Sequence, residues 1–127
     1  MSREHPDGTT VSDLIGRIRD TLKDETDLHT IILFGSGARG ALTSVGELRS
    51  DLDLAVAADK PLDIRRRLEL MSLISDATGR EVDLVDLHTA HGAILKQILT
   101  KGRSVRHHSP DFVAGKALEM YDHQMFF

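Results

Sequence analysis

Residues 31–36 read Ile31-Ile32-Leu33-Phe34-Gly35-Ser36, and residues 51–57 read Asp51-Leu52-Asp53-Leu54-Ala55-Val56-Ala57. The two apolar runs predict two buried strands, and a glycine-serine turn ends the first of them. Successive side chains of a strand point to opposite faces, so Asp51 and Asp53 are expected on the same face. Neighbouring carboxylates repel each other unless a cation lies between them, and oxygen ligands suit magnesium or manganese. Because glycines let backbone N–H groups approach an anion, the stretch predicts a site for a nucleoside triphosphate and a divalent metal ion.

The rest of the chain predicts helices that alternate with strands. The expected helices span about residues 11–25, 62–78 and 90–101, and a last one begins at Pro110 and runs towards Gln124. The expected strands are Thr30–Phe34, Asp51–Ala58, Glu81–Leu87 and a short edge strand, Ser104–Arg106. Thr10 or Ser12 is expected to cap the first helix, and Gly79 to follow the second. This pattern predicts an α/β (α+β) fold in which helices pack mainly on one face of a small mixed sheet.

Length and composition limit the classes of protein that fit. The 127 residues suit a single domain over residues 11–127 behind a flexible tail of residues 1–10. The formal charge of −4 and the few aromatic residues disfavour a nucleic-acid partner. The chain contains no cysteine, which excludes disulfides and thiolate zinc sites. No apolar run approaches the roughly 20 residues that span a bilayer, and residues 1–10 lack the apolar region of a signal peptide, so we expect a cytoplasmic protein.

A third carboxylate belongs to the strand Glu81–Leu87. If this strand pairs beside the second strand, Asp83 stands next to Asp51 and Asp53 and completes a cluster of three acids. Such a cluster can hold two magnesium ions about 3.5–4 Å apart, which clamp the two oxygens of an in-line displacement at phosphorus. Asp86 lies on the opposite face of the strand and is expected at the surface.

These residues together resemble a known family. The glycine-serine turn at Gly35-Ser36, the Asp51-x-Asp53 pair and the later Asp83 are similar to the motifs of the polymerase-β-like nucleotidyltransferase superfamily. Their context resembles in particular the minimal nucleotidyltransferase (MNT) domains, the antitoxins of HEPN/MNT toxin–antitoxin pairs. The resemblance covers about residues 28–105.

The resemblance implies a role for each motif residue. Gly35 and Ser36 contact the triphosphate of ATP, Asp51 and Asp53 bind magnesium, and Asp83 binds a second magnesium ion and helps to deprotonate the acceptor hydroxyl. Arg39 is a further candidate for a phosphate contact, because a guanidinium binds phosphate oxygens in pairs. Members of this antitoxin group are similar to protein adenylyltransferases, which move AMP from ATP to a tyrosine hydroxyl on the HEPN ribonuclease. A HEPN toxin is therefore the implied partner.

Several alternatives stay open at the level of sequence. The segment Gly37–Ser50 is longer than the family usually has between the serine and the first aspartate, which is compatible with a longer loop or with an altered site. The acceptor of the nucleotide can instead be a small molecule such as an aminoglycoside, and a non-catalytic antitoxin that acts by binding is a further reading. The basic run Arg65–Arg67 favours a solvated helix face, and a contact with a partner or with RNA is the alternative. The apolar residues near the C-terminus suit either the core or an interface in a homo- or hetero-oligomer.

Overall fold

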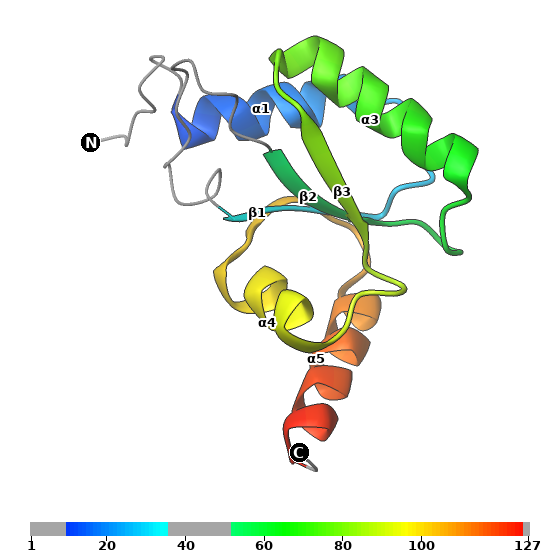
Figure 1. Ribbon diagram of the computed structural model, residues 1–127, viewed down its shortest axis with the longest axis vertical. Coiled ribbons are helices and arrows are strands. Elements are labelled where there is room, and N and C mark those ends of the chain that lie inside the picture. Colours follow the sequence, from blue (N-terminus) through cyan, green and yellow to red (C-terminus); the bar gives the residue numbers. More distant parts are fainter. Residues whose placement is uncertain (1–9, 36–51, 126–127) are drawn as a thin grey trace.

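The computed structural model describes residues 10–35 and 52–125, with side chains described as far as Tyr121 (Figure 1). Its elements are α1 (Val11–Thr21), β1 (Thr30–Phe34), β2 (Leu52–Ala57), α3 (Ile64–Thr78), β3 (Val82–Asp86), α4 (Gly92–Lys101), β4 (Arg103–His107) and α5 (Pro110–Met125). All the predicted helices and strands are confirmed, although their ends differ by a few residues. The predicted tail lies outside the described residues except for Thr10, and the single domain over residues 11–127 stays a prediction.

The four strands form one sheet in the order β3-β2-β1-β4. β1 runs antiparallel to both β2 and β4, whereas β2 and β3 are parallel. The sheet is therefore mixed, as predicted. Parallel neighbours need a crossover connection, and α3 supplies it between β2 and β3. β1 and β2 occupy the centre, where every residue of β1 is buried, as expected for a continuous apolar run.

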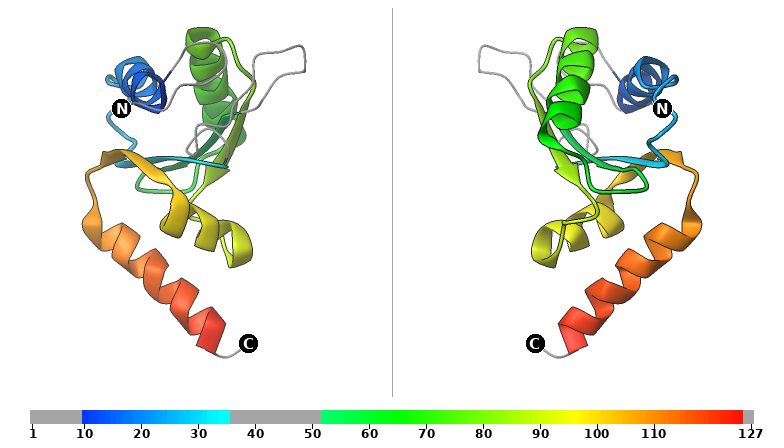
Figure 2. Two further views of the ribbon diagram at one scale, coloured as in Figure 1. Left: turned by 90° about the vertical axis from the view of Figure 1, so that its left-hand side faces the viewer. Right: turned by 90° about the vertical axis from the view of Figure 1, so that its right-hand side faces the viewer.

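Helices cover both faces of the sheet (Figures 1 and 2). Alternate residues of β1 join different apolar clusters: Ile31 and Leu33 pack on the side of α1 and α3, and Ile32 and Phe34 on the side of α4. α5 adds Met120 to the second cluster. The prediction of helices mainly on one face is therefore too narrow. The prediction accounts for α1 and α3, which pack on one face. The central strands are apolar on both faces, so helices must also cover the other face.

Local capping signals set the ends of the helices. The Thr10 hydroxyl accepts a hydrogen bond from the Asp13 N–H (2.9 Å), and the Asp13 carboxylate accepts one from the Thr10 N–H (3.4 Å). This reciprocal pair is a capping box at the start of α1, so Thr10 is the cap rather than Ser12. Asp63 caps α3 by accepting a hydrogen bond from the Arg66 N–H (2.8 Å). Gly79 ends α3 in the left-handed conformation, with φ of 71°, as the sequence predicted.

The buried face of α3 agrees only in part with its sequence pattern. The helical spacing of Leu68, Met71, Ile74 and Ser75 predicts that they share one side. Ile74 is fully buried and Met71 packs against the core, but Leu68 is 59% exposed and Leu70 is fully buried instead. A helix turns by about 100° per residue, so Leu68 and Leu70 lie on nearly opposite sides. The sheet accepts only one of these two sides, and tertiary packing selects Leu70.

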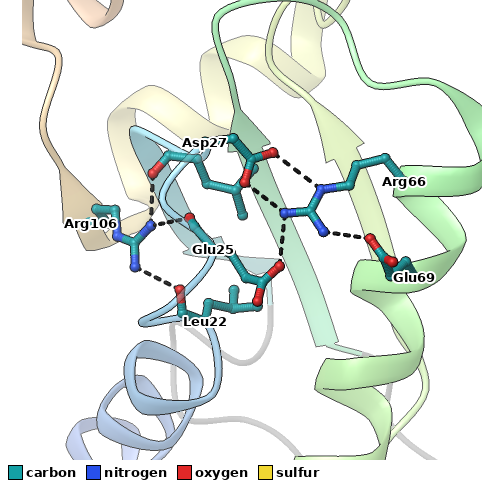
Figure 3. Close-up of polar contacts among 7 residues, drawn as sticks. Leu22, Glu25, Asp27, Arg66, Glu69 and Arg106 are labelled. Atoms are coloured by element: carbon teal, nitrogen blue, oxygen red, sulfur yellow. Dashed lines mark hydrogen bonds and ion pairs between the residues drawn. The ribbon is translucent and has the colours of Figure 1, made fainter.

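The basic run Arg65–Arg67 is not a uniformly solvated face, although the sequence favoured that interpretation. Only Arg65 is exposed. The Arg66 guanidinium contacts the carboxylates of Glu25 (2.9 Å), Asp27 (2.7 Å) and Glu69 (2.6 Å), as Figure 3 shows. The hydrogen bond with Asp27, together with weaker ones to Glu69 and Glu25, raises the pKa of Arg66 against the opposing effect of burial. The Arg67 guanidinium donates a hydrogen bond to the Leu84 carbonyl of β3.

A second arginine fixes the connection between α1 and β1. Arg106 of β4 donates three hydrogen bonds of 2.8 Å, to the backbone carbonyls of Leu22, Glu25 and Leu28 (Figure 3). Because the planar guanidinium reaches three carbonyls at once, it closes the end of α1 and the turn that follows. Within the described ranges no helix is long and apolar enough to cross a membrane.

Candidate active site

The structure places two of the predicted acids side by side. Asp53 of β2 and Asp83 of β3 are direct partners in the parallel register. Neighbouring strands lie about 4.8 Å apart, and paired residues of a sheet project from the same face. Asp53 is half-buried because β2 lies inside the sheet, whereas Asp83 is exposed on the edge strand. Their side chains share the face that carries the second apolar cluster, next to Ala55 and Ala57.

Gly35 lies directly beside Asp53. It follows Phe34, which pairs with Asp53 in the antiparallel register of β1 and β2. Its φ is +70°, a conformation that favours glycine. A β-carbon on Gly35 would overlap Oδ2 of Asp53 and would lie 3.1 Å from its Cγ. The turn after β1 and the Asp53 carboxylate therefore form one compact unit.

The remaining predicted site residues, Ser36, Arg39 and Asp51, lie outside the described residues, and their roles stay predictions. Within residues 10–35 and 52–125, no group of three or more His, Cys, Asp or Glu side chains is arranged to hold a metal ion. The described part of the site thus consists of Asp53 and Asp83, with Gly35 beside the first.

A hollow of about 440 Å³ adjoins Asp83 where α3 packs against β3. Its described lining comprises Met71, Ser72 and Ser75 of α3 and Glu81, Val82 and Asp83. Sequence reasoning missed this feature, and no local pattern signals it, because it arises only when the helix docks beside the edge strand. The hollow lies between α3 and the edge strand β3, and Asp83 is part of its lining.

Asp86 is not a surface residue, which corrects the prediction. Its side chain points to the face of α1 and α3, and the residue is only 4% exposed. Its two carboxylate oxygens accept hydrogen bonds from two backbone N–H groups, those of Leu62 (2.7 Å) and His88 (2.9 Å). A buried carboxylate requires such partners, and here it fixes the segments that flank β3. Asp86 therefore has a structural role rather than a place beside Asp83.

Comparison with known proteins identifies the family. Residues 16–111 match the family model described as polymerase beta, nucleotidyltransferase, which covers more than half of the chain. The chain belongs to this nucleotidyltransferase family. A similar curated protein is the protein adenylyltransferase MntA of Shewanella oneidensis, which is 33% identical over 112 residues, or 87% of this chain and 76% of that protein.

Solved structures similar to this chain agree with the fold. A crystal structure of a toxin–antitoxin with AMP-PNP contains a chain that is 32% identical, with a TM-score of 0.70 over 88% of this chain and 90% of that chain. A structure of the tri-AMPylated HEPN toxin of Shewanella oneidensis in complex with MNT antitoxin gives 29% identity and a TM-score of 0.68, over 91% and 90%.

The donor atoms of the site suit a hard divalent cation. Asp53 and Asp83 are paired across neighbouring strands and both offer carboxylate oxygens. Such oxygens are the ligands that magnesium prefers. Soft or nitrogen ligands are absent from this described pair. In a nucleotidyltransferase, two carboxylates side by side can hold a cation against the phosphates or accept a proton from an attacking hydroxyl.

Proposed function

We propose that this nucleotidyltransferase moves AMP from ATP to a hydroxyl of a cognate HEPN ribonuclease toxin, and so acts as its antitoxin. The acceptor is a tyrosine hydroxyl. The observation that carries the proposal is the register pairing of Asp53 with Asp83 in a chain that resembles a protein adenylyltransferase over most of its length. Related structures hold an ATP analogue and an AMPylated toxin, which supports ATP as the donor and a HEPN protein as the acceptor.

Different residues of the chain bind the metal ions and the triphosphate. Asp53, with Asp51, holds the first magnesium ion, and Asp83 contributes to a second. When bound, these ions neutralise charge on the triphosphate, which is the largest part of what phosphoryl-type transfer requires. Gly35 and Ser36 offer backbone and hydroxyl groups to the triphosphate at the end of β1, and Arg39 supplies a phosphate contact.

The transfer itself is a displacement at the α-phosphorus of ATP. The tyrosine oxygen forms a bond to this phosphorus, the bond to the bridging oxygen breaks, and pyrophosphate leaves with the electron pair. The proton of the hydroxyl passes to the Asp83 carboxylate. Asp83 suits this role because it is exposed on the edge strand, where an acceptor hydroxyl can reach it.

A protein acceptor also fits the exposure of Asp83. Enzymes that act on small molecules enclose their substrates in pockets, and the described residues around Asp83 leave it open to solvent. A partner that presents its own tyrosine removes the need for such walls. Because the reaction uses ATP and silences a ribonuclease, we place it in the cytoplasm.

The direct test uses α-labelled ATP, magnesium and the cognate toxin. We expect label on a toxin tyrosine, and loss of this label when Asp51→Ala and Asp53→Ala are combined. Asp20→Ala serves as the matched control, since Asp20 is an exposed carboxylate of α1 whose loss leaves the site intact. Removal of magnesium with a chelator should stop the transfer as well.

Other results would identify the alternatives. Label on an aminoglycoside instead of the toxin would favour transfer to a small molecule. If no transfer occurs and the doubly substituted protein still neutralises the toxin, the chain acts by binding alone and the proposal is wrong.

A further inference from the structure

Among the glycines that the structure describes, Gly35 is the one whose β-carbon would meet a carboxylate. The space is filled by the side chain of Asp53: a built β-carbon would overlap Oδ2 and would lie 3.1 Å from Cγ and 3.3 Å from Cβ. Real β-carbons essentially never come so close to another heavy atom as this one would to Oδ2. The Asp53 carboxylate thus lies against the backbone of residue 35.

Two other glycines provide a natural comparison. Gly79 and Gly92 have φ values of +71° and +66°, nearly the same as the +70° of Gly35. A β-carbon on either of them would meet no atom within 4 Å. The left-handed backbone is therefore common to all three positions, and only Gly35 adds the close approach of a site carboxylate. Comparing Gly35 with Gly79 and Gly92 therefore separates two effects of a β-carbon: the strain of a left-handed backbone and the overlap with a neighbouring side chain.

We propose that Gly35 is a positioning residue for the Asp53 carboxylate. Its missing β-carbon leaves the room in which the carboxylate rests, at the point where the end of β1 meets the start of β2 and Asp53 pairs with Asp83. Any larger residue at position 35 displaces the carboxylate from this position. The catalytic consequence rests on the proposed function, but the placement itself does not.

The first test is a double-mutant cycle in urea unfolding of the full chain, without metal or nucleotide. Gly35→Ala is made in the native background and in an Asp53→Ala background, and Gly79→Ala is the control with equal backbone strain. In the native background we expect Gly35→Ala to lower the urea midpoint by more than Gly79→Ala does. In the Asp53→Ala background, where the overlapping oxygen is absent, the two glycine substitutions should lower the midpoint equally.

The second test measures Mn²⁺ binding by electron paramagnetic resonance. We expect Gly35→Ala to weaken Mn²⁺ binding at least tenfold, with no change for Gly79→Ala. A carboxylate that swings aside without destabilising the fold shows only this effect, so either the coupling in the cycle or the loss of Mn²⁺ affinity supports the proposal. A Gly35→Ala protein that shows no coupling and binds Mn²⁺ as Gly79→Ala does overturns it.

Two further outcomes are also decisive. If Gly35→Ala alone prevents folding, rescue by the added Asp53→Ala supports the proposal, and failure of that rescue refutes it. If the native protein neither transfers AMP nor binds Mn²⁺, the proposed function fails, while the unfolding cycle still decides the role of Gly35.

Discussion

The buried carboxylate of Asp86 allows a prediction that depends on single atoms. Its Oδ2 accepts a hydrogen bond from the Leu62 N–H at 2.7 Å, and its Oδ1 accepts one from the His88 N–H at 2.9 Å. Asparagine has nearly the same shape but only one acceptor oxygen. In Asp86→Asn the amide NH₂ must therefore face one of the two backbone donors, whichever way the side chain turns.

The size of the effect follows from these contacts. One hydrogen bond to a charged acceptor is lost, which costs about 1.5–3 kcal/mol, and its backbone N–H is left without a partner at a site that is 4% exposed. The other bond weakens because its acceptor becomes neutral. We expect a loss of about 3 kcal/mol in the free energy of unfolding. At a urea m-value of about 2 kcal/mol/M, this lowers the midpoint by about 1.5 M.

Urea unfolding followed by circular dichroism at 222 nm measures this loss, provided that the m-value stays constant. The matched control is Asp63→Asn, because Asp63 is an exposed helix cap that uses only one oxygen, and asparagine caps a helix as well as aspartate does, so the change should stay within about 0.5 kcal/mol. Equal midpoints for Asp86→Asn and Asp63→Asn would refute the two-oxygen argument.

Three other substitutions test the packing with the same assay. Gly102→Ala should cost about 1–3 kcal/mol, because its β-carbon would overlap Cγ2 of Ile32 and the carbonyl oxygen of Ile98; an unchanged midpoint would contradict this. Gly16→Ala should instead stabilise α1 by about 0.5–1 kcal/mol, since apart from the neighbouring backbone of α1 no atom lies within 4 Å of the new β-carbon, and a loss of stability would show that the space is not open. Arg106→Lys should cost about 2 kcal/mol, because an ammonium group cannot reproduce the guanidinium contacts to three carbonyls; full stability would mean that these contacts contribute little.

The sequence predicted the features that depend on local patterns. The Thr10 cap, the Gly79 end of α3 and the continuous apolar run of β1 each act over a few residues, and each is found in the structure. The errors arise where distant segments decide. The side of α3 that is buried depends on the sheet beneath it, and one of the two partners of Asp86, Leu62, lies 24 residues away in the chain. Cover on both faces of the sheet likewise depends on where α4 and α5 dock.

The described part of the site was more predictable than these features because it needs only the directions of three strands and the pairing of β3 beside β2. β2 and β3 are parallel, so the residues near their first ends, Asp53 and Asp83, lie side by side at the same end of the strands. β1 is antiparallel to β2, so the last end of β1, at Gly35, lies at that same end of the strands. A turn glycine after one strand and acids at the start of two others therefore converge once these three strands are neighbours in the sheet. Strand direction does not predict the hollow beside Asp83, because the hollow depends on how α3 packs against β3. The hollow is thus set by tertiary packing, whereas the carboxylate pair is set by topology.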